Sequence, residues 1–262
     1  MYRVDSMSVW FCIPSIRPGG GTIPLWRDMG YKVAVLRQGD PIDCEVQIPT
    51  GKYRGWAPSV NILAKWVVEH DQHAEWIVSG GDDYEPDRAK TADEIGDECL
   101  EHFADILWRR PNATPYDTTF GVMQPTGDRW GDTPAARRQY GENRGAYIDR
   151  IAGSPWFGRE WVKRAYGGNG PMFAGYHHMY ADEELLEVAT KLGVYWARPD
   201  LIQLHQHWGR RPGDEFANIK DCPEFLQPVN THQHWQDSGN LFVKRKAAGW
   251  PGHEPLLTSV SV

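Results

Sequence analysis

The chain has 262 residues, of which 28 are Lys or Arg and 35 are Asp or Glu, so its formal net charge is −7. This acidic balance is not the basic signature of a nucleic-acid-binding protein. A mean hydropathy of −0.59, with no apolar run near the ~18 residues of a membrane span, argues against an integral membrane protein. The 40% of hydrophobic residues suffice for a core, and the 13 Trp, 27 Gly and 19 Pro indicate many loops and aromatic surfaces.

The cysteine pattern and the first residues of the chain indicate the cellular compartment in which we expect the protein. Cys12, Cys44, Cys99 and Cys222 are scattered, which fits neither a disulfide framework nor zinc-site spacing. The opening segment at residues 1–10 lacks the charged and then apolar pattern of a signal peptide. We therefore expect a cytoplasmic protein.

The first third of the chain alternates strand and helix patterns. Apolar runs at residues 7–13, 31–36 and 76–78 predict buried strands. Helical periodicity starts at residue 58, and again after the capping box Thr91-Ala92-Asp93-Glu94. Alternation of this kind predicts an α/β fold, in which a mixed, mostly parallel sheet of Rossmann-like type is flanked by helices.

The rest of the chain is more irregular. We expect a strand at residues 118–123 and a short helix at 159–165. The polar, glycine-rich segment 124–150 is too long for an ordinary connection, so it is either a functional loop or disordered. A clearer helix is predicted over 182–192, and a strand over 201–204 would deliver His205 and His207.

An acidic turn follows the third predicted strand, in the sequence Gly80-Gly81-Asp82-Asp83-Tyr84-Glu85. Adjacent carboxylates repel each other, so a turn that places them at the end of a buried strand is suited to a cation. Oxygen ligands favour Mg²⁺ or Mn²⁺, and open α/β sheets bind ligands beyond the carboxyl ends of their strands. The alternative is an ordinary solvated turn, in which Asp and Gly are common.

A second acidic group, Asp182-Glu183-Glu184, stands at the predicted start of a helix. The helix dipole favours carboxylates in a first turn, which is a sufficient structural reason for them. The functional interpretation makes Asp182 a general base that takes a proton from a hydroxyl within hydrogen-bond reach.

Histidines occur in the pairs His177-His178, His205-x-His207 and His232-x-His234. Residues i and i+2 of a strand point to the same side, so His205 and His207 are candidates for a shared ligand. Two histidines and a carboxylate form a transition-metal pattern, although the zinc-protease motif H-E-x-x-H is absent.

The order of these pieces resembles the glycosyltransferases of the GT-A fold, in particular the large inverting family two. The resemblance covers roughly residues 7–210. Its motifs are, in chain order, Pro14-Ser15-Ile16-Arg17-Pro18, Asn61 near a helix start, Asp82-Asp83, Gly153-Ser154, Ala181-Asp182-Glu183-Glu184-Leu185, and His205 or His207.

The resemblance implies transfer of a sugar from a nucleotide-sugar donor, most often a UDP-sugar, with inversion and with Asp182 as the base. It implies Mn²⁺ or Mg²⁺ on the donor diphosphate, with the metal ligands drawn from Asp83, Asp82, His205 and His207. The donor-binding residues it implies are Pro14, Ser15, Arg17, Asn61 and Asp82.

Two departures from the family pattern leave alternatives open. Ala181 stands where the family has Glu, so the choice of Asp182 over Glu183 as the base is open. The acidic turn is not a clean Asp-x-Asp, so Glu85 is an alternative to Asp82 as the partner of Asp83.

The acceptor side is the least defined part of the hypothesis. Trp156, Glu183 and Trp208 are candidates for it. The two tryptophans are included because aromatic rings pack well against the C–H faces of sugar rings. Residues 1–210 would form the catalytic domain, and residues 211–262 a C-terminal extension packing on it, itself a candidate for the acceptor side. A glycan, a lipid, a protein or a modified nucleobase are all open as acceptor.

Two rival functions come from other classes of protein. One is a zinc or other divalent-metal hydrolase built on the His-x-His pairs. The other is a non-catalytic protein that binds a nucleotide sugar or a glycan.

Overall fold

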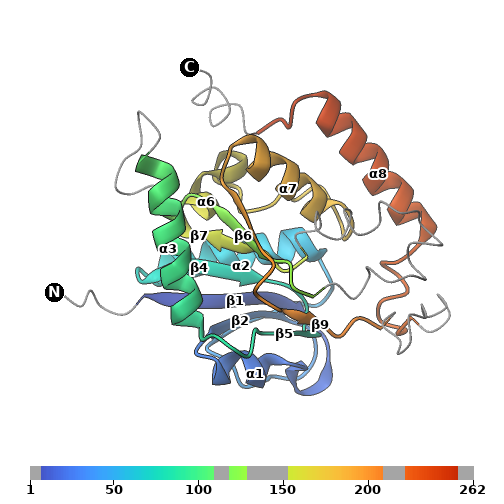
Figure 1. The fold of residues 1–262 in the computed structure, drawn as a ribbon. Helices are drawn as coiled ribbons and strands as arrows, with labels where there is room; N and C mark the ends of the chain where they lie inside the picture. The colour runs from blue at the N-terminus through green and yellow to red at the C-terminus, as the bar shows by residue number, and fades with distance from the viewer. Residues whose placement is uncertain (1–6, 109–117, 129–152, 209–221, 253–262) are drawn as a thin grey trace.

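A computed structural model describes residues 7–108, 118–128, 153–208 and 222–252 (Figure 1). In these ranges the chain forms one seven-stranded sheet and one two-stranded sheet. The strands of the large sheet are β1 (Ser8–Ser15), β2 (Lys32–Arg37), β3 (Val46–Pro49), β4 (Ala74–Ser79), β6 (Val122–Pro125), β7 (Trp156–Gly158) and β8 (Tyr195–Arg198). The small sheet pairs β5 (Tyr84–Glu85) with β9 (Leu204–His205).

The large sheet has the order β3-β2-β1-β4-β7-β6-β8. β7 is antiparallel to both of its neighbours, β4 and β6, whereas the other pairings are parallel. The predicted mixed, mostly parallel α/β sheet with helices on its faces is confirmed. The strand predicted at 201–204 is displaced, because only Leu204 and His205 pair, and β3, β7 and β8 were not predicted.

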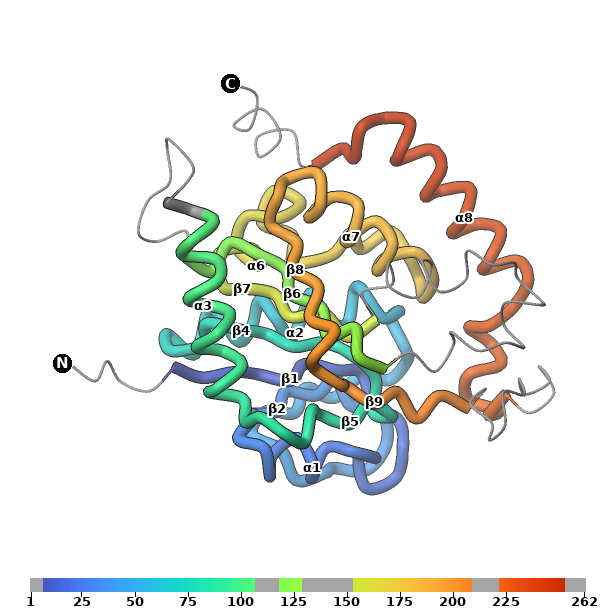
Figure 2. Tube along the Cα trace, in the orientation of Figure 1, coloured from blue at the N-terminus to red at the C-terminus, as the bar shows by residue number. Residues whose placement is uncertain are grey.

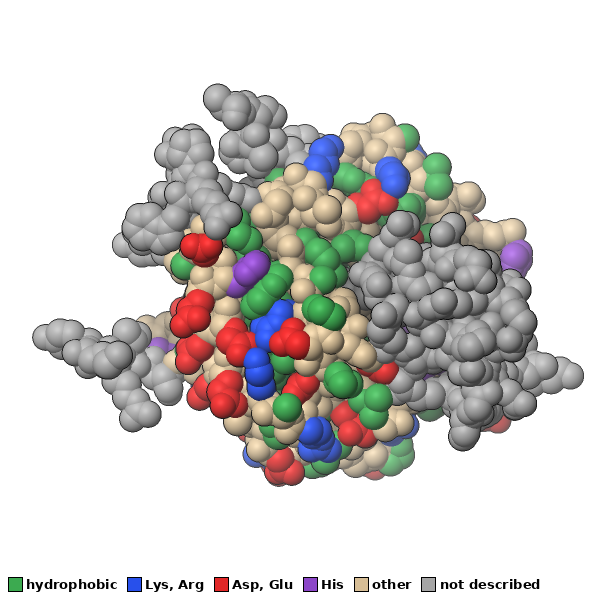
Figure 3. All heavy atoms as spheres, in the orientation of Figure 1, with side chains coloured by type: hydrophobic (Ala, Val, Ile, Leu, Met, Phe, Trp, Pro, Cys, Tyr) green, Lys and Arg blue, Asp and Glu red, His purple; other side chains and the backbone are tan. Residues whose placement is uncertain are grey.

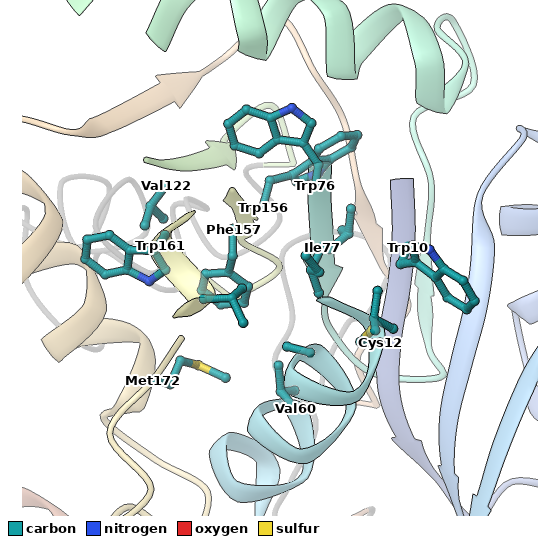
Figure 4. Close-up of a cluster of buried hydrophobic side chains, with 14 of the residues drawn as sticks. Trp10, Cys12, Val60, Trp76, Ile77, Val122, Trp156, Phe157, Trp161 and Met172 are labelled. Atoms are coloured by element: carbon teal, nitrogen blue, oxygen red, sulfur yellow. The ribbon is translucent and has the colours of Figure 1, made fainter. Parts of the chain in front are cut away.

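Helices cover both faces of the sheet. They are α1 (Ile23–Asp28), α2 (Trp56–His70), α3 (Ala92–Trp108), α6 (Arg159–Arg164), α7 (Ala181–Lys191) and α8 (His232–Ala247), with 3₁₀ turns at Pro18–Gly20 and Ala165–Gly168. α2 and α3 pack on opposite faces (Figure 4), which is why β1 is an almost continuous apolar run. The capping box forms as predicted: the Thr91 backbone N–H donates to Glu94 Oε2 at 2.8 Å, and the Glu94 N–H donates to Thr91 Oγ1 at 3.4 Å.

Trp156 lies in the core of the sheet. Trp156 has 0% exposure, and its indole N–H donates to Gln203 Oε1 at 2.6 Å (Figure 4). Its expected place on the acceptor side is therefore wrong, because the ring belongs to β7 and packs inside the sheet. The sequence hid this because the segment around residue 156 resembles a loop, with Gly153 and Pro155 just before it.

Exposed acidic side chains gather over α3, from Asp93 to Asp105, on the face that Figure 3 shows. No helix in the described ranges is long and apolar enough to cross a membrane. The four cysteines are unpaired, and Cys12 and Cys99 are fully buried.

Candidate active site

The site begins where parallel strands end together. β1, β2 and β4 run in the same direction, so Ser15, Arg37 and Ser79 close them at one edge of the sheet. The chain leaves β4 directly into the turn that carries Asp82 and Asp83. This is the edge at which open α/β sheets bind their ligands.

Asp82 is tied to the end of β1. Ser15 Oγ donates to Asp82 Oδ2 at 2.8 Å, and the Arg17 backbone N–H donates to the same oxygen at 3.3 Å. The guanidinium Nε of Arg17 donates to Asp82 Oδ1, also at 3.3 Å. The buried Arg37 supports this arrangement, since its Nη1 donates to Ser15 Oγ at 3.2 Å and to the Arg17 carbonyl at 3.0 Å. Both carboxylate oxygens of Asp82 thus have protein partners.

The glycine-rich segment after Arg17 approaches the acidic turn closely. A Cβ on Gly21 would lie 2.1 Å from the Asp82 carbonyl oxygen, and this glycine has φ +62°. The next residue, Thr22, donates its backbone N–H to the same carbonyl at 3.1 Å. Only glycine permits this contact, so the segment fixes the backbone of the turn.

Asp83 and His205 come together because β5 pairs with β9. The two strands of this small sheet lie side by side (Figure 2), with Tyr84 paired to His205. The rings of Tyr84 and His205 stack with centroids 3.9 Å apart. The His205 Nε2 atom lies 3.6 Å from Asp83 Oδ2. The Gln206 backbone N–H donates to the Asp83 carbonyl at 2.7 Å. The predicted proximity of the acidic turn and the later histidine is therefore observed.

Carboxylates hold the His205 segment in place. The buried Asp87 accepts the Ile202 backbone N–H at 2.7 Å, and Asp128 accepts the His205 backbone N–H at 2.7 Å. The ring of His207 lies 4.9 Å from that of His205, as expected for residues i and i+2. His207 also acts electrostatically on Asp83.

Asp83 is held as an anion. Burial on its own would raise the pKa of Asp83, but the hydrogen bond and charge of His205, with the charges of Arg17 and His207, outweigh burial. The pKa of Asp83 is therefore lowered. An ionised carboxylate beside an imidazole is a set of donors that suits a divalent cation.

The surroundings of Asp83 also fit a cation. A Cβ on Gly81 would lie 2.6 Å from Asp83 Oδ1, so the missing side chain leaves that oxygen room. Glu85, the alternative partner, is engaged elsewhere: it accepts from Gln206 Nε2 at 2.9 Å and lies 3.6 Å from Arg88. Among the described residues, no group of three His, Cys, Asp or Glu side chains forms a ready-made metal site.

Asp182 lies in the first turn of α7, as predicted. Burial, followed by the neighbouring charge of Glu183, raises the pKa of Asp182 to about 7, although backbone N–H groups of the turn counteract part of this. A carboxylate with this pKa can accept a proton near neutral pH. Glu183 is half-buried in the same turn and stays a candidate for the acceptor side.

The segment that leads into α7 passes beside the Asp83 turn. The charge of Asp83 acts on the His178 ring, whose Nδ1 lies 2.9 Å from Tyr53 Oη. Burial, with help from the neighbouring His177, lowers the pKa of His178 to about 4, so this ring is neutral. The carbonyl of His177 accepts the Trp56 backbone N–H at 2.9 Å, which attaches the segment to the start of α2.

One feature of the site was not predicted. Glu184 is fully buried and accepts hydrogen bonds from Arg245 of α8, with Nε to Oε2 and Nη2 to Oε1 both at 2.7 Å. Tyr166 and Tyr176 donate their hydroxyls to the same carboxylate, at 2.9 and 2.8 Å. The Lys244-Arg245-Lys246 run was the available signal, but nothing in its sequence reveals a buried arginine.

Other predicted site residues have different surroundings. Asn61 is buried, and its amide donates to the Met172 carbonyl at 2.7 Å and accepts the Met172 N–H at 3.1 Å. This side chain fixes the loop before α7, and its contact with the donor stays a prediction. His232 and His234 lie on a helix, where residues i and i+2 point apart, so they do not form the expected pair.

The roles of Pro14 and Trp208 remain predictions. Pro14 is a half-buried residue of β1 paired with Leu36, near the proposed donor. Trp208 is half-buried, and the centre of its ring lies 5.1 Å from that of His207.

No family model and no curated protein matches the chain. Among solved structures, the catalytic domain of Drosophila beta1,4-galactosyltransferase 7 with xylobiose is 15% identical, has a TM-score of 0.42, and is matched over 87% of this chain and 80% of its own. A mutant of that galactosyltransferase with manganese, UDP-Gal and xylobiose is also 15% identical with a TM-score of 0.42, over 82% and 79%. A glycosyltransferase involved in glycosylation of the major capsid of PBCV-1 is 9% identical with a TM-score of 0.31, over 73% and 81%. At these values the function has to be argued from the geometry of the chain itself.

Proposed function

We propose that this protein is a metal-dependent inverting glycosyltransferase that moves a sugar from a nucleotide-sugar donor, a UDP-sugar in the first instance, to an acceptor hydroxyl. The observation that carries the proposal is a pair of carboxylates with opposite tendencies. The pKa of Asp83 is lowered and that of Asp182 is raised to about 7. Such a division of acid–base behaviour is typical of catalytic sites.

The donor side of the reaction belongs to the edge formed by β1, β2 and β4. Asp83 and His205 would hold Mn²⁺ or Mg²⁺ there, while Ser15 and Arg17 hold Asp82 and shape the loop beside the nucleotide. When bound, the cation neutralises charge that develops on the departing diphosphate. The side chain of Arg17 is 40% exposed, so it can also reach a donor oxygen.

The acceptor side belongs to the first turn of α7. Asp182 takes the proton of the acceptor hydroxyl as that oxygen attacks the anomeric carbon. The bond between the anomeric carbon and the diphosphate oxygen breaks, and the nucleoside diphosphate leaves with the electron pair. A single displacement with no enzyme nucleophile inverts the anomeric configuration.

The proposal is tested by measuring nucleoside diphosphate release from a panel of nucleotide sugars, with and without Mn²⁺, in the presence of candidate acceptors. We expect metal-dependent release and a product whose anomeric coupling in the proton NMR spectrum is opposite to that of the donor. Donor binding without transfer or hydrolysis would favour the non-catalytic binder. Stoichiometric, tightly bound zinc would favour the hydrolase, and either result would overturn the proposal.

A further inference from the structure

Helix α7 starts without the side-chain cap that commonly fixes the first turn of a helix. Its N-cap residue is Tyr180, which has a left-handed backbone (φ 71°, ψ −4°) and makes no side-chain cap hydrogen bond. Asp182 is the second residue of this turn. Contacts with other parts of the chain therefore have to hold the turn in place.

Arg245 supplies such a contact on one side of Asp182. It forms the two-pronged ion pair with Glu184 described above, and the side chains are 8% and 0% exposed, respectively. The arginine is itself fixed, because its Nη2 donates to the Pro251 carbonyl at 3.0 Å and its guanidinium lies 3.4 Å from the centre of the Phe173 ring. Two tyrosine hydroxyls complete the hydrogen bonding of Glu184.

Helix α8, which carries Arg245, also contacts the chain on the other side of Asp182, at Tyr180. The centre of the Tyr180 ring lies 5.9 Å from that of the Trp235 ring and 5.4 Å from that of the Phe242 ring, and both of these residues are on α8. A Cβ on Gly239 would lie 3.3 Å from the Tyr180 hydroxyl, so the helix backbone is close to this ring. α8 therefore contacts the residue two before Asp182 and the residue two after it.

We propose that α8 is a positioning element of the active site, in which Arg245, through Glu184, holds the helical turn that carries Asp182. This inference rests on the proposed role of Asp182 as the base. It gives the C-terminal segment a positioning role, which differs from the place on the acceptor side expected from the sequence. In Figure 1, α8 lies along the outer side of α7, at the right of the molecule.

The Arg245–Glu184 ion pair contributes more to the geometry of the α7 turn than to the stability of the fold. A buried ion pair is often no more stabilising than well-packed apolar residues in its place. What the pair supplies is a fixed orientation, since the planar guanidinium presents two parallel donors to one carboxylate. A base displaced by roughly 1 Å can cost about 100-fold in rate, so a device of this kind has a catalytic consequence.

The test compares Arg245→Lys with Lys246→Met. Lysine keeps the charge but not the two parallel donors, whereas Lys246 pairs with Glu187 on the surface between the same two helices. We expect Arg245→Lys to lower kcat about 10-fold to 100-fold, to leave the donor Kd within about twofold, and to speed hydrogen exchange of the backbone amides of Glu183, Glu184 and Leu185. Lys246→Met should leave all three quantities near the wild-type values.

The outcomes separate the inference from the proposed function. If Arg245→Lys leaves both kcat and the exchange of the α7 amides unchanged, the positioning role is wrong. If it lowers only the thermal midpoint, Arg245 has a merely structural role and the inference again fails. If the wild type transfers no sugar while the exchange difference is still present, the proposed function fails and the hold on the α7 turn stands.

A second variant tests the inference in a protein that is expected to fold normally. The double substitution Glu184→Gln with Arg245→Met removes both buried charges together, so no unpaired charge is left in the interior. We expect a folded protein whose far-ultraviolet circular dichroism matches the wild type and whose kcat is reduced at least as much as in Arg245→Lys. Wild-type kcat in this double variant would also overturn the inference.

Discussion

Ser15 Oγ lies 2.8 Å from Asp82 Oδ2, and this hydrogen bond joins the ends of two strands whose contacting residues are 67 positions apart. With Arg17 on the other oxygen, the carboxylate of Asp82 is engaged by protein groups. Adjacent carboxylates in one turn thus have different surroundings: Asp82 joins the ends of β1 and β4, and Asp83 lies beside His205.

The first prediction concerns Asp82. Asp82→Asn removes the charge that Arg17 pairs with, so we expect a loss of about 1–3 kcal/mol in the free energy of unfolding and weaker donor binding. Urea denaturation and donor titration calorimetry measure the two effects. Asp43→Asn is the control, because Asp43 is 89% exposed and pairs with Arg27 on the surface. A fully stable Asp82→Asn protein would contradict the structural role given to this carboxylate.

Asp83 should control metal dependence. Asp83→Ala removes the ionised oxygen donor beside His205, so we expect Mn²⁺-stimulated turnover to fall by at least about 100-fold, with little change in fold. Electron paramagnetic resonance of Mn²⁺ with UDP reports the metal directly. Glu85→Gln should retain most activity, since Glu85 is engaged by Gln206 and Arg88. Equal losses in both variants would contradict the choice of Asp83.

Asp182 should control the pH dependence of the rate. The base must be ionised, and its pKa is raised to about 7, so kcat should rise with pH and level off above about 8. Asp182→Asn should lower kcat by about 100-fold to 10,000-fold and leave donor affinity intact. Glu183→Gln serves as the comparison in the same turn. If Glu183→Gln abolishes transfer and Asp182→Asn does not, the roles of these residues are reversed.

The raised pKa of Asp182 should also make the stability of the fold depend on pH. The ordinary pKa of an aspartate is 3.8, and the folded-state pKa of Asp182 is about 7. Between these values the folded protein binds a proton that the unfolded chain has lost, so this group destabilises the fold as pH rises from about 4 to about 7. Asp182→Asn should therefore gain in stability relative to the wild type across this range. Urea denaturation at several pH values measures the difference, and a pH-independent difference would argue against the raised pKa.

Trp156 and Trp208 should behave in opposite ways. Trp156→Ala removes a fully buried ring, so we expect a loss of about 3–5 kcal/mol in the free energy of unfolding. Trp208→Ala removes a half-buried ring next to His207 and should cost little stability while raising the acceptor KM. Thermal denaturation and acceptor titrations distinguish the effects. Wild-type stability in Trp156→Ala would contradict the core position of this ring.

Local patterns predicted the parts of the fold that depend on local physics. The apolar run of β1, the Thr91–Glu94 capping box and the acidic turn after β4 all formed as expected. The buried position of Trp156 depends on β7 entering the sheet between β4 and β6, which a three-residue strand does not signal. In the same way, the meeting of Glu184 with Arg245 joins residues 61 positions apart and is decided by tertiary packing alone.

Asp83 belongs to the first third of the chain, but the strand that carries His205 is added only after 120 further residues, when β9 pairs with β5. A nascent chain leaving the ribosome therefore contains the acidic turn long before it contains its histidine. Any fragment that ends before Leu204 has the acidic turn and Arg17 but lacks His205 and His207, two of the groups that lower the pKa of Asp83. The pairing of the acidic turn with the His205 strand is thus completed late in synthesis.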